Sequence, residues 1–302
     1  MTKTKEPLPA SENPIGTTFS LCILCHDRPA ELTDALRSAE GLSWREVVVL
    51  DMGSEPLIPP RTGVTWLRFD SNVGVTAGRN HLVGKATGDV LVFLDDDAVF
   101  VSSPLEKLQE IFEADPTLGA VAFRVRRREG DDRSLEHPFR GAGRRKRDPA
   151  TASDCAYFVG CGYAIRRRAH LDVGGYDDRY FYSTEEVDLS FRLLKEGWHL
   201  RYEPEVEVEH RPSARGRKGS AMVPGWRLRN RLLLVRAHLP LGIAITHAAI
   251  WFVRTGLEAT AAGVLPAWWR LGLEGLSLPA ERRPLPWREL LDIHRQGGRV
   301  LY

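Results

Sequence analysis

The chain has 302 residues, of which 43% are hydrophobic and 27% are charged. This composition is typical of a globular protein with a sizeable core, and it excludes disordered, collagen-like and heptad-repeat chains. The 42 basic and 40 acidic residues leave a net charge of +2, so the overall charge gives no reason to expect nucleic acid as a partner.

We expect no secretory targeting signal in the N-terminal sequence. Residues 1–17 are polar and rich in proline, without the apolar segment of a signal peptide, and we interpret them as an N-terminal tail. Four cysteines do not make a disulfide scaffold, so we expect a cytoplasmic protein. No stretch reaches the ~20 apolar residues that span a bilayer. The nearest candidate, residues 237–253, is uncharged but contains Pro240.

Strands alternate with helices in the first part of the chain. Apolar runs and period-two alternation predict strands at residues 19–25, 46–50, 64–69 and 90–94. Helical spacing predicts helices at residues 29–39 and 104–114, with a glycine-containing loop and helix over residues 72–88 in which Thr76 is a candidate N-cap. This alternation indicates an α/β fold with a Rossmann-like, mostly parallel sheet flanked by helices.

The pattern changes twice further along the chain. Residues 126–148 are charged and rich in glycine, as in a long loop, before order returns with a helix at 185–195, ended by Gly197, and a strand at 206–210. Residues 211–238 then hold eight basic residues and no acid, and Trp-, Leu- and Arg-rich helical segments follow. We therefore divide the chain into a tail (1–17), a catalytic α/β domain (18–212) and a basic, aromatic helical region (213–302).

The strongest chemical signal is the run Asp95-Asp96-Asp97, which directly follows an apolar strand. Ligands of open parallel sheets bind beyond the carboxyl ends of strands. Three adjacent carboxylates repel one another unless a cation neutralises them, and oxygen ligands suit Mg²⁺ or Mn²⁺. The alternative is a solvated acidic turn, but Asp51 at the end of the neighbouring strand favours a site.

Two further features join this site. His210 is in phase with Val206 and Val208, a pattern that by itself is more typical of a core histidine. Glu185, Glu186 and Asp188 open a helix, where acids also interact favourably with the helix dipole. Together with the acidic run they suggest a metal-carboxylate cluster, a separate acid pair and a late histidine.

Other motifs carry simpler interpretations. The run from Cys22 to His26 matches a haem-attachment pattern, but it lies in a buried strand where positions i and i+3 point to opposite faces. This geometry argues against haem attachment and against a Cys-x-x-Cys redox pair. The arginine clusters 126–128, 144–147 and 166–168 are interpreted as solvated surface, with attraction of an anionic substrate or membrane as the alternative. We expect no nucleic-acid partner, because no recognised nucleic-acid module is visible.

From about Phe19 to His210 the sequence resembles family-2 glycosyltransferases of the GT-A fold, of the rhamnosyl- and galactofuranosyltransferase type. The matching segments occur in the family's order. They are residues 24–29 at the first-strand exit, 47–54, the glycine-rich 72–80, the DXD-type 94–97, 160–167 and 174–177 on the acceptor side, the acidic helix 185–192, and His210. A lone DXD is weak, whereas this ordered set is specific.

The resemblance implies a role for each matched residue in donor and metal binding. Asp51 would bind the nucleobase or ribose of a nucleotide-sugar donor, Asp96 the ribose and diphosphate, and Arg79 the diphosphate. The metal, Mn²⁺ or Mg²⁺, would be held by Asp95, Asp97 and His210. The donor's nucleobase stays open, because Cys25-His26 departs from the family pattern at the base pocket.

The resemblance also implies inverting transfer, in which a carboxylate deprotonates an acceptor hydroxyl. Glu186 aligns with this base, but the family usually has Asp there, so Glu185 and Asp188 stay open as alternatives. Acceptors of the family include lipid-linked glycans, polysaccharides and natural products. The rival interpretations are a nucleotidyltransferase acting on sugar phosphates and a non-catalytic nucleotide-sugar-binding module of the same fold.

The helical region suggests contact with the cytoplasmic face of a membrane. Leu228, Leu232, Val235 and Leu239 fall on one helical stripe, flanked by Arg229, Arg231 and Arg236, while Trp251, Trp268 and Trp269 suit the headgroup level. The alternative is that these helices pack on the catalytic domain or form a homodimer interface.

Overall fold

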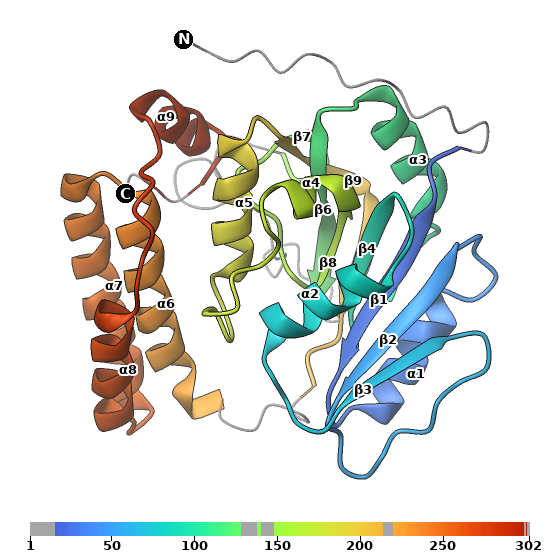
Figure 1. Cartoon of the computed structure of the whole chain (residues 1–302), viewed down its shortest axis with the longest axis horizontal. Helices are drawn as coiled ribbons and strands as arrows, with labels where there is room; N and C mark the ends of the chain where they lie inside the picture. The colour runs from blue at the N-terminus through green and yellow to red at the C-terminus, as the bar shows by residue number, and fades with distance from the viewer. Residues whose placement is uncertain (1–15, 128–137, 140–147, 214–219, 299, 301–302) are drawn as a thin grey trace.

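The computed structural model describes residues 16–127, 138–139, 148–213, 220–298 and 300 of the chain. A central sheet has helices on both faces, and a group of helices from the C-terminal part of the chain lies beside it (Figure 1). Most of the expected tail, most of the loop 126–148 and the arginine cluster 144–147 lie outside the described residues.

Nine strands of the described chain form one mixed sheet in the order β3-β2-β1-β4-β8-β6-β9-β5, with β7 paired to β9. Six strands run in one direction (β1, β2, β3, β4, β6 and β9) and three run against them. The mostly parallel α/β fold expected from the sequence is therefore confirmed. The strands are β1 (Phe19–Cys25), β2 (Glu46–Met52), β3 (Thr65–Phe69), β4 (Val90–Asp95), β5 (Ala98–Phe100), β6 (Leu118–Arg127), β7 (Ser153–Asp154), β8 (Gly162–Arg166) and β9 (His199–His210).

The helices of the described residues are α1 (Pro29–Ser38), α2 (Val75–Lys85), α3 (Leu105–Ala114), α4 (Arg167–Asp172), α5 (Glu185–Lys195), α6 (Val223–His238), α7 (Leu241–Ala261), α8 (Leu265–Ser277) and α9 (Trp287–Arg295). Of these, α1, α2, α3 and α5 lie at the segments predicted for them, whereas the others had no predicted bounds. Gly197 follows α5 with φ +81°, as its C-terminal role requires. The N-cap prediction for Thr76 is wrong: α2 begins at Val75, and the Thr76 hydroxyl donates to the Tyr180 carbonyl over 2.8 Å.

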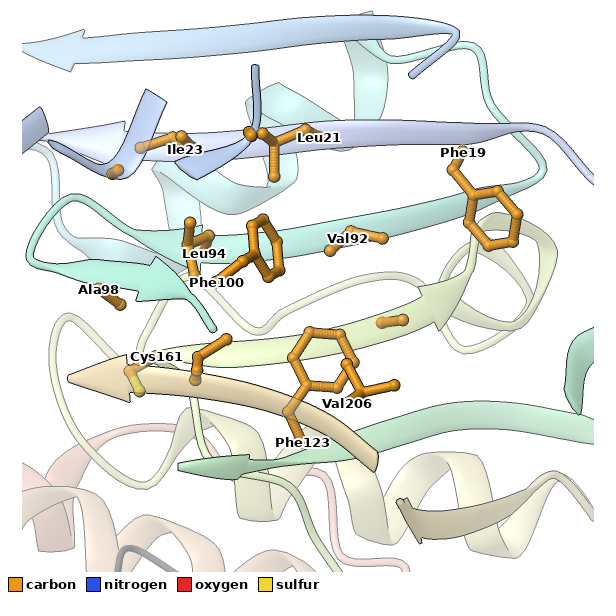
Figure 2. Close-up of a cluster of buried hydrophobic side chains, with 14 of the residues drawn as sticks. Phe19, Leu21, Ile23, Val92, Leu94, Ala98, Phe100, Phe123, Cys161 and Val206 are labelled. Atoms are coloured by element: carbon orange, nitrogen blue, oxygen red, sulfur yellow. The ribbon is translucent and has the colours of Figure 1, made fainter. Parts of the chain in front are cut away.

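The two faces of the sheet each bury an apolar cluster. Figure 2 shows part of one of them, with Leu21 and Ile23 of β1 on one side and Phe123 of β6 on the other. Cys25 belongs to this cluster and Cys22 to the cluster on the opposite face. The strand therefore separates the two thiols, which confirms the argument against a Cys-x-x-Cys pair.

The C-terminal helices share a core with the catalytic domain. Leu234 and Val235 of α6 and Leu290 of α9 cluster with Ala156 and Phe191 of the α/β part. The predicted membrane stripe is thus wrong as a lipid-facing surface, because its four members are buried in the protein: Leu228, Leu232, Val235 and Leu239.

The flanking arginines and tryptophans also differ from the prediction. Arg229 pairs with Glu274 over 2.7 Å, and Arg236 donates to carbonyls of α8 and its end. Trp251 and Trp268 are buried, and only Trp269 of the three is exposed. Among the described helices, none is long and apolar enough to cross a membrane.

Candidate active site

A cavity of about 370 Å³ lies where the carboxyl end of β4 meets α5 and the C-terminal helices. It brings together five of the predicted site residues: Arg79, Asp95, Glu185, Glu186 and His210. The helices α6 and α7 add a wall of four residues: Arg227, Arg231, Trp251 and Arg254. Residues more than 150 positions apart in the sequence thus face one space.

Arg79 is the buried centre of the site. Its Nη1 lies 3.2 Å from Glu186 Oε1, and its Nη2 donates to the Gly160 carbonyl over 2.8 Å and lies 3.5 Å from Asp95 Oδ1. The guanidinium also lies over the rings of Tyr163 and Tyr176, at 5.5 and 5.6 Å from their centroids. The Arg79 guanidinium therefore connects Asp95, at the end of β4, with the acidic residues at the start of α5.

Glu185 and Glu186 occupy different environments although they are adjacent. Glu185 is almost fully buried, and burial together with the neighbouring charge of Glu186 raises the pKa of Glu185 well above its usual range. Glu186 is more open, with its side chain 17% exposed, and faces the cavity. Both carboxylates lie near the Arg79 guanidinium, with Nη1 3.8 Å from Glu185 Oε1 and 3.2 Å from Glu186 Oε1, and Glu186 is the more exposed of the two.

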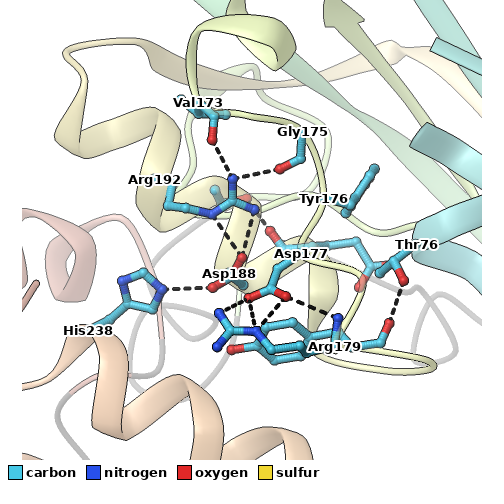
Figure 3. Close-up of polar contacts among 12 residues, drawn as sticks. Thr76, Val173, Gly175, Tyr176, Asp177, Arg179, Asp188, Arg192 and His238 are labelled. Carbon is cyan, nitrogen blue, oxygen red and sulfur yellow. Dashed lines mark hydrogen bonds and ion pairs between the residues drawn. The ribbon is translucent and has the colours of Figure 1, made fainter. Parts of the chain in front are cut away.

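Asp188 points away from this cavity. Figure 3 shows it between Arg192 and His238, with Arg192 Nη2 at 2.7 Å and His238 Nε2 at 2.7 Å. Burial alone would raise the pKa of Asp188, but the His238 hydrogen bond and the charge of Arg192 lower it to about 2. Because His238 belongs to α6, this ion pair fastens the acidic helix to the C-terminal region.

The segment before α5 has an unusual backbone. Ser183 and Thr184 have φ values of 71° and 83°, a left-handed conformation that is rare for residues other than glycine and is found preferentially at functional sites. Asn230 of α6 donates to the carbonyls of Tyr182 and Ser183, both over 2.7 Å. The C-terminal region thus holds the turn that presents Glu185 and Glu186.

The acidic run is neutralised mainly by arginine. Arg28 Nη1 lies 2.7 Å from Asp96 Oδ1 and 3.0 Å from Asp97 Oδ2. Burial raises the pKa of Asp96 to about 7. His210 Nε2 lies 3.4 Å from Asp97 Oδ1. Among these acids only Asp95 lines the cavity, together with His210. Asp96 and Asp97 are buried, and Asp97 lines a separate cavity beside Arg211 and Ser213.

The donor set of Asp95, Asp97 and His210 is chemically suited to a divalent cation, since carboxylate oxygens and imidazole both bind Mn²⁺. Asp97 and His210 are already in contact, and Asp95 shares the cavity with His210. Across the residues that the structure describes, however, no three His, Cys, Asp or Glu side chains are placed to share one ion. The three side chains are therefore of the chemical type that binds a divalent cation.

Asp51 lies outside the cavity. It is fully buried at the end of β2, ion-paired with Arg68 and accepting the Ser54 amide over 2.9 Å. Arg28 and Arg68 are therefore the partners that the sequence patterns left unassigned, although Arg28 stands in the matched segment 24–29. Arg166, interpreted as solvated surface, instead donates to the carbonyls of Phe112 and Asp115 at the end of α3.

Sequence reasoning also missed the close approach of Gly160. A Cβ at this position would lie 2.0 Å from Glu186 Oε1 and 2.8 Å from Arg79 Nη2. The wall formed by Arg227, Arg231, Trp251 and Arg254 was missed as well, because the helical periodicity of α6 and α7 does not reveal which face meets a cavity. The match of residues 160–167 to an acceptor-side strand was the one signal near Gly160.

The chain resembles glycosyltransferases when it is compared with known proteins. The family description "Glycosyl transferase family 2" matches residues 20–174. A pre-mycofactocin glycosyltransferase of Mycobacterium tuberculosis is 30% identical over 215 residues, which cover 68% of this chain and 44% of that protein. An N-acetylglucosaminyl-diphospho-decaprenol L-rhamnosyltransferase of the same organism is 39% identical over 74 residues, 24% of each chain.

Among solved structures, GalNAc-T7 with UDP, GalNAc and Mn²⁺ superimposes with a TM-score of 0.63 at 17% identity. The match covers 86% of this chain and 55% of that one. At this identity the likeness establishes the fold, which is the expected GT-A fold with an added C-terminal helical region. The chain spans less than half the length of the first of these relatives.

Proposed function

This chain belongs to glycosyltransferase family 2, and we propose that it is a metal-dependent inverting enzyme that moves a sugar from a nucleotide-sugar donor to an acceptor hydroxyl. The observation that carries the proposal is the carboxyl group of Glu186, held by Arg79 at 3.2 Å in the same cavity as Asp95 and His210. A carboxylate base and a metal-binding acid motif in one space are the two elements that such a transfer needs.

Glu186 is the proposed catalytic base. It removes the proton from the acceptor hydroxyl while the oxygen attacks the sugar C1, and the bond from C1 to the diphosphate breaks on the opposite side. A positioned base of this kind contributes ~10²–10⁴-fold to the rate. Glu185 is the less accessible carboxyl because it is almost fully buried beside Glu186, and Asp188 acts as a positioning residue through its contacts with Arg192 and His238.

The donor's diphosphate is proposed to lie at the acidic run. Asp95, Asp97 and His210 would hold Mn²⁺ or Mg²⁺, which when bound supplies Lewis-acid stabilisation of the departing nucleoside diphosphate. Asp96 would contact the ribose and diphosphate. Asp51 is ion-paired with Arg68, so it would contact the nucleoside only if its carboxylate binds Arg68 and the nucleoside at the same time. Arg79 orients Glu186 and Asp95, in addition to the role toward the diphosphate that the resemblance implies.

The acceptor and the cellular location are also proposals. The acceptor classes remain lipid-linked glycan, polysaccharide or natural product, and the rhamnosyltransferase relative is named for a lipid diphosphate. We place the protein in the cytoplasm, in line with four buried free cysteines, and its contact with the membrane on an exposed apolar face of α7 and α8. The domain limits at residues 17 and 212 remain predictions.

The decisive experiment incubates the purified full chain with a panel of nucleotide sugars and Mn²⁺, and identifies the products by anion-exchange chromatography. A glycosyltransferase releases free sugar and nucleoside diphosphate by slow donor hydrolysis, and EDTA abolishes this release. Pyrophosphate formation from sugar phosphate and nucleoside triphosphate would indicate a nucleotidyltransferase instead. Donor binding without any turnover would indicate a non-catalytic module.

A further inference from the structure

One wall of the active-site cavity consists of side chains that the proposed chemistry does not use. Arg227 and Arg231 stand four residues apart on α6, and Trp251 and Arg254 stand three apart on α7, so each pair shares a helix face. All four line the same cavity as Glu186. Within the described residues, neither helix contributes an acidic side chain to this lining.

The guanidinium groups of this wall are held in place. Arg231 and Arg254 lie over the ring of Trp251, with 4.5 and 5.1 Å between each guanidinium carbon and the ring centroid. Glu258 accepts from Arg227 over 3.0 Å and from Arg254 over 3.3 Å. Glu258 thus pairs with two of the three arginines. Because stacking and ion pairing restrict these long side chains, little conformational entropy remains to be lost when they bind a ligand.

The wall is also accessible. The side chains of Arg227 and Arg254 are 41% and 49% exposed. Across the cavity, in contrast, Arg79 is buried and engaged by Glu186, Asp95 and the Gly160 carbonyl. The two cationic groups therefore differ in function: Arg79 organises the catalytic acids, whereas the α6–α7 wall presents its charge to whatever enters the cavity.

We propose that the wall formed by Arg227, Arg231 and Arg254 binds an anionic group of the acceptor, of the phosphate or phosphodiester class. The inference rests on the proposed function, because an acceptor whose hydroxyl reaches Glu186 must enter this cavity. Guanidinium pairs phosphate oxygens with two parallel hydrogen bonds and so fixes orientation as well as affinity. The wall would place the acceptor hydroxyl relative to Glu186 by holding the anion next to it.

The test measures ligand-induced thermal shifts of the full chain. The probes are octyl phosphate, inorganic phosphate and octanol, all below micellar concentration, with UDP and GDP plus Mn²⁺ as donor-side probes. Octyl phosphate is expected to raise the melting temperature while octanol does not. A response to inorganic phosphate equal to that of octyl phosphate assigns recognition to the anion alone, and a weaker one assigns it to an alkylated anion; both support the anionic site.

Matched substitutions locate the site. Arg231→Gln and Arg254→Gln should each weaken octyl phosphate by about tenfold or more, as expected for a lost hydrogen bond to a charged group. Arg288→Gln removes an exposed arginine of α9 outside the cavity and should leave the response unchanged. The proposal is overturned if octyl phosphate produces no shift, or if the cavity variants weaken UDP or GDP but not octyl phosphate, which would assign the wall to the donor. Failure of the proposed glycosyltransferase function would give a different result: UDP and GDP would not bind, and no nucleotide sugar would be hydrolysed.

Discussion

Arg79 and Glu186 form the ion pair on which the candidate active site is built. The two come from α2 and α5, 107 positions apart, and meet over 3.2 Å between Nη1 and Oε1. The same guanidinium reaches Asp95 and the Gly160 carbonyl. The position of the proposed base is therefore fixed relative to the acidic run before any substrate enters, which is the preorganisation that a base needs.

Replacement of Glu186 by glutamine tests the base directly. Glu186→Gln keeps the shape of the side chain and an oxygen that accepts from Arg79, but it removes proton acceptance. We expect transfer to fall by about 10²–10⁴-fold while the melting-temperature shift caused by UDP or GDP with Mn²⁺ is retained. Glu185→Gln is the matched control, since it changes the adjacent carboxyl, which is almost fully buried and whose pKa burial raises. Normal turnover of Glu186→Gln beside an inactive Glu185→Gln would move the base to Glu185.

Substitution of Gly160 by alanine should displace the base without touching its chemistry. The added Cβ would meet Glu186 Oε1 at 2.0 Å and Arg79 Nη2 at 2.8 Å, so the Arg79–Glu186 pair must shift. A misplacement of this size costs about 10²-fold in rate. Gly84→Ala in α2 is the control, because a Cβ there meets nothing within 4 Å. Steady-state kinetics of both variants check the prediction, and wild-type kcat in Gly160→Ala would contradict it.

The parallel strands and the acidic residues could be predicted because their signals are local. Apolar runs predict the strands that end near Asp51 and Asp95, and the start of α5 is recognisable as a cluster of acidic residues in the sequence. The partners of these acids were not predictable from the same patterns. Arg28, Arg68 and Arg79 reach carboxylates through tertiary packing, and spacing along the chain carries no information on such contacts.

The helical region illustrates the same limit. The stripe containing Leu228 and Leu232 was correctly identified as apolar, but periodicity does not distinguish a face that packs on protein from one that faces lipid. Both residues are buried. Exposed apolar side chains lie instead on α7 and α8. Apolar residues occur on several faces of these helices, and tertiary packing decides which face stays exposed to solvent.

The buried carboxylate of Asp188 makes a prediction about acid stability. Its pKa of about 2 in the folded protein lies below the ordinary value of 3.8, so its contribution is present above about pH 4 and is lost as the pH falls toward 2. The contribution at neutral pH is about 2 kcal/mol. The charged groups that face it are Arg192, His238, Lys195 and Arg179.

Asp188→Asn should therefore lower the free energy of unfolding at pH 7 by at least about 2 kcal/mol, and the difference from wild type should shrink between about pH 4 and pH 2. Urea unfolding at several pH values measures it. Asp292→Asn provides the control, because its pair with Arg295 is exposed and such pairs contribute less than about 1 kcal/mol. A difference that stays constant across this pH range would show that Asp188 is not ionised and paired as described.

The outer face of α7 and α8 is the proposed membrane contact. It exposes Leu241, Ile245, Phe252, Val253 and Leu257 from α7, and Leu265, Trp269, Leu273 and Leu276 from α8. An apolar groove of about 350 Å³ runs between the two helices over α6. Exposed apolar surface of this kind marks an interaction site. The inner faces of the same helices pack on the protein, so the chain would lie on a bilayer without crossing it.

Flotation with vesicles of phosphatidylcholine and phosphatidylglycerol tests this face. The full chain should float with the vesicles at low salt and less so at high salt, because salt screens the electrostatic part of binding. Trp269→Glu and Leu273→Glu place a charge in the exposed face and should abolish flotation while leaving the melting temperature within a few degrees, as surface substitutions do. Leu171→Glu is the matched control, since Leu171 of α4 is similarly exposed, at 51% against 52% for Leu273. Light scattering identifies the competing arrangement: a dimer that the two face variants convert to monomer, with no flotation of the wild type, would assign the face to a second copy of the chain.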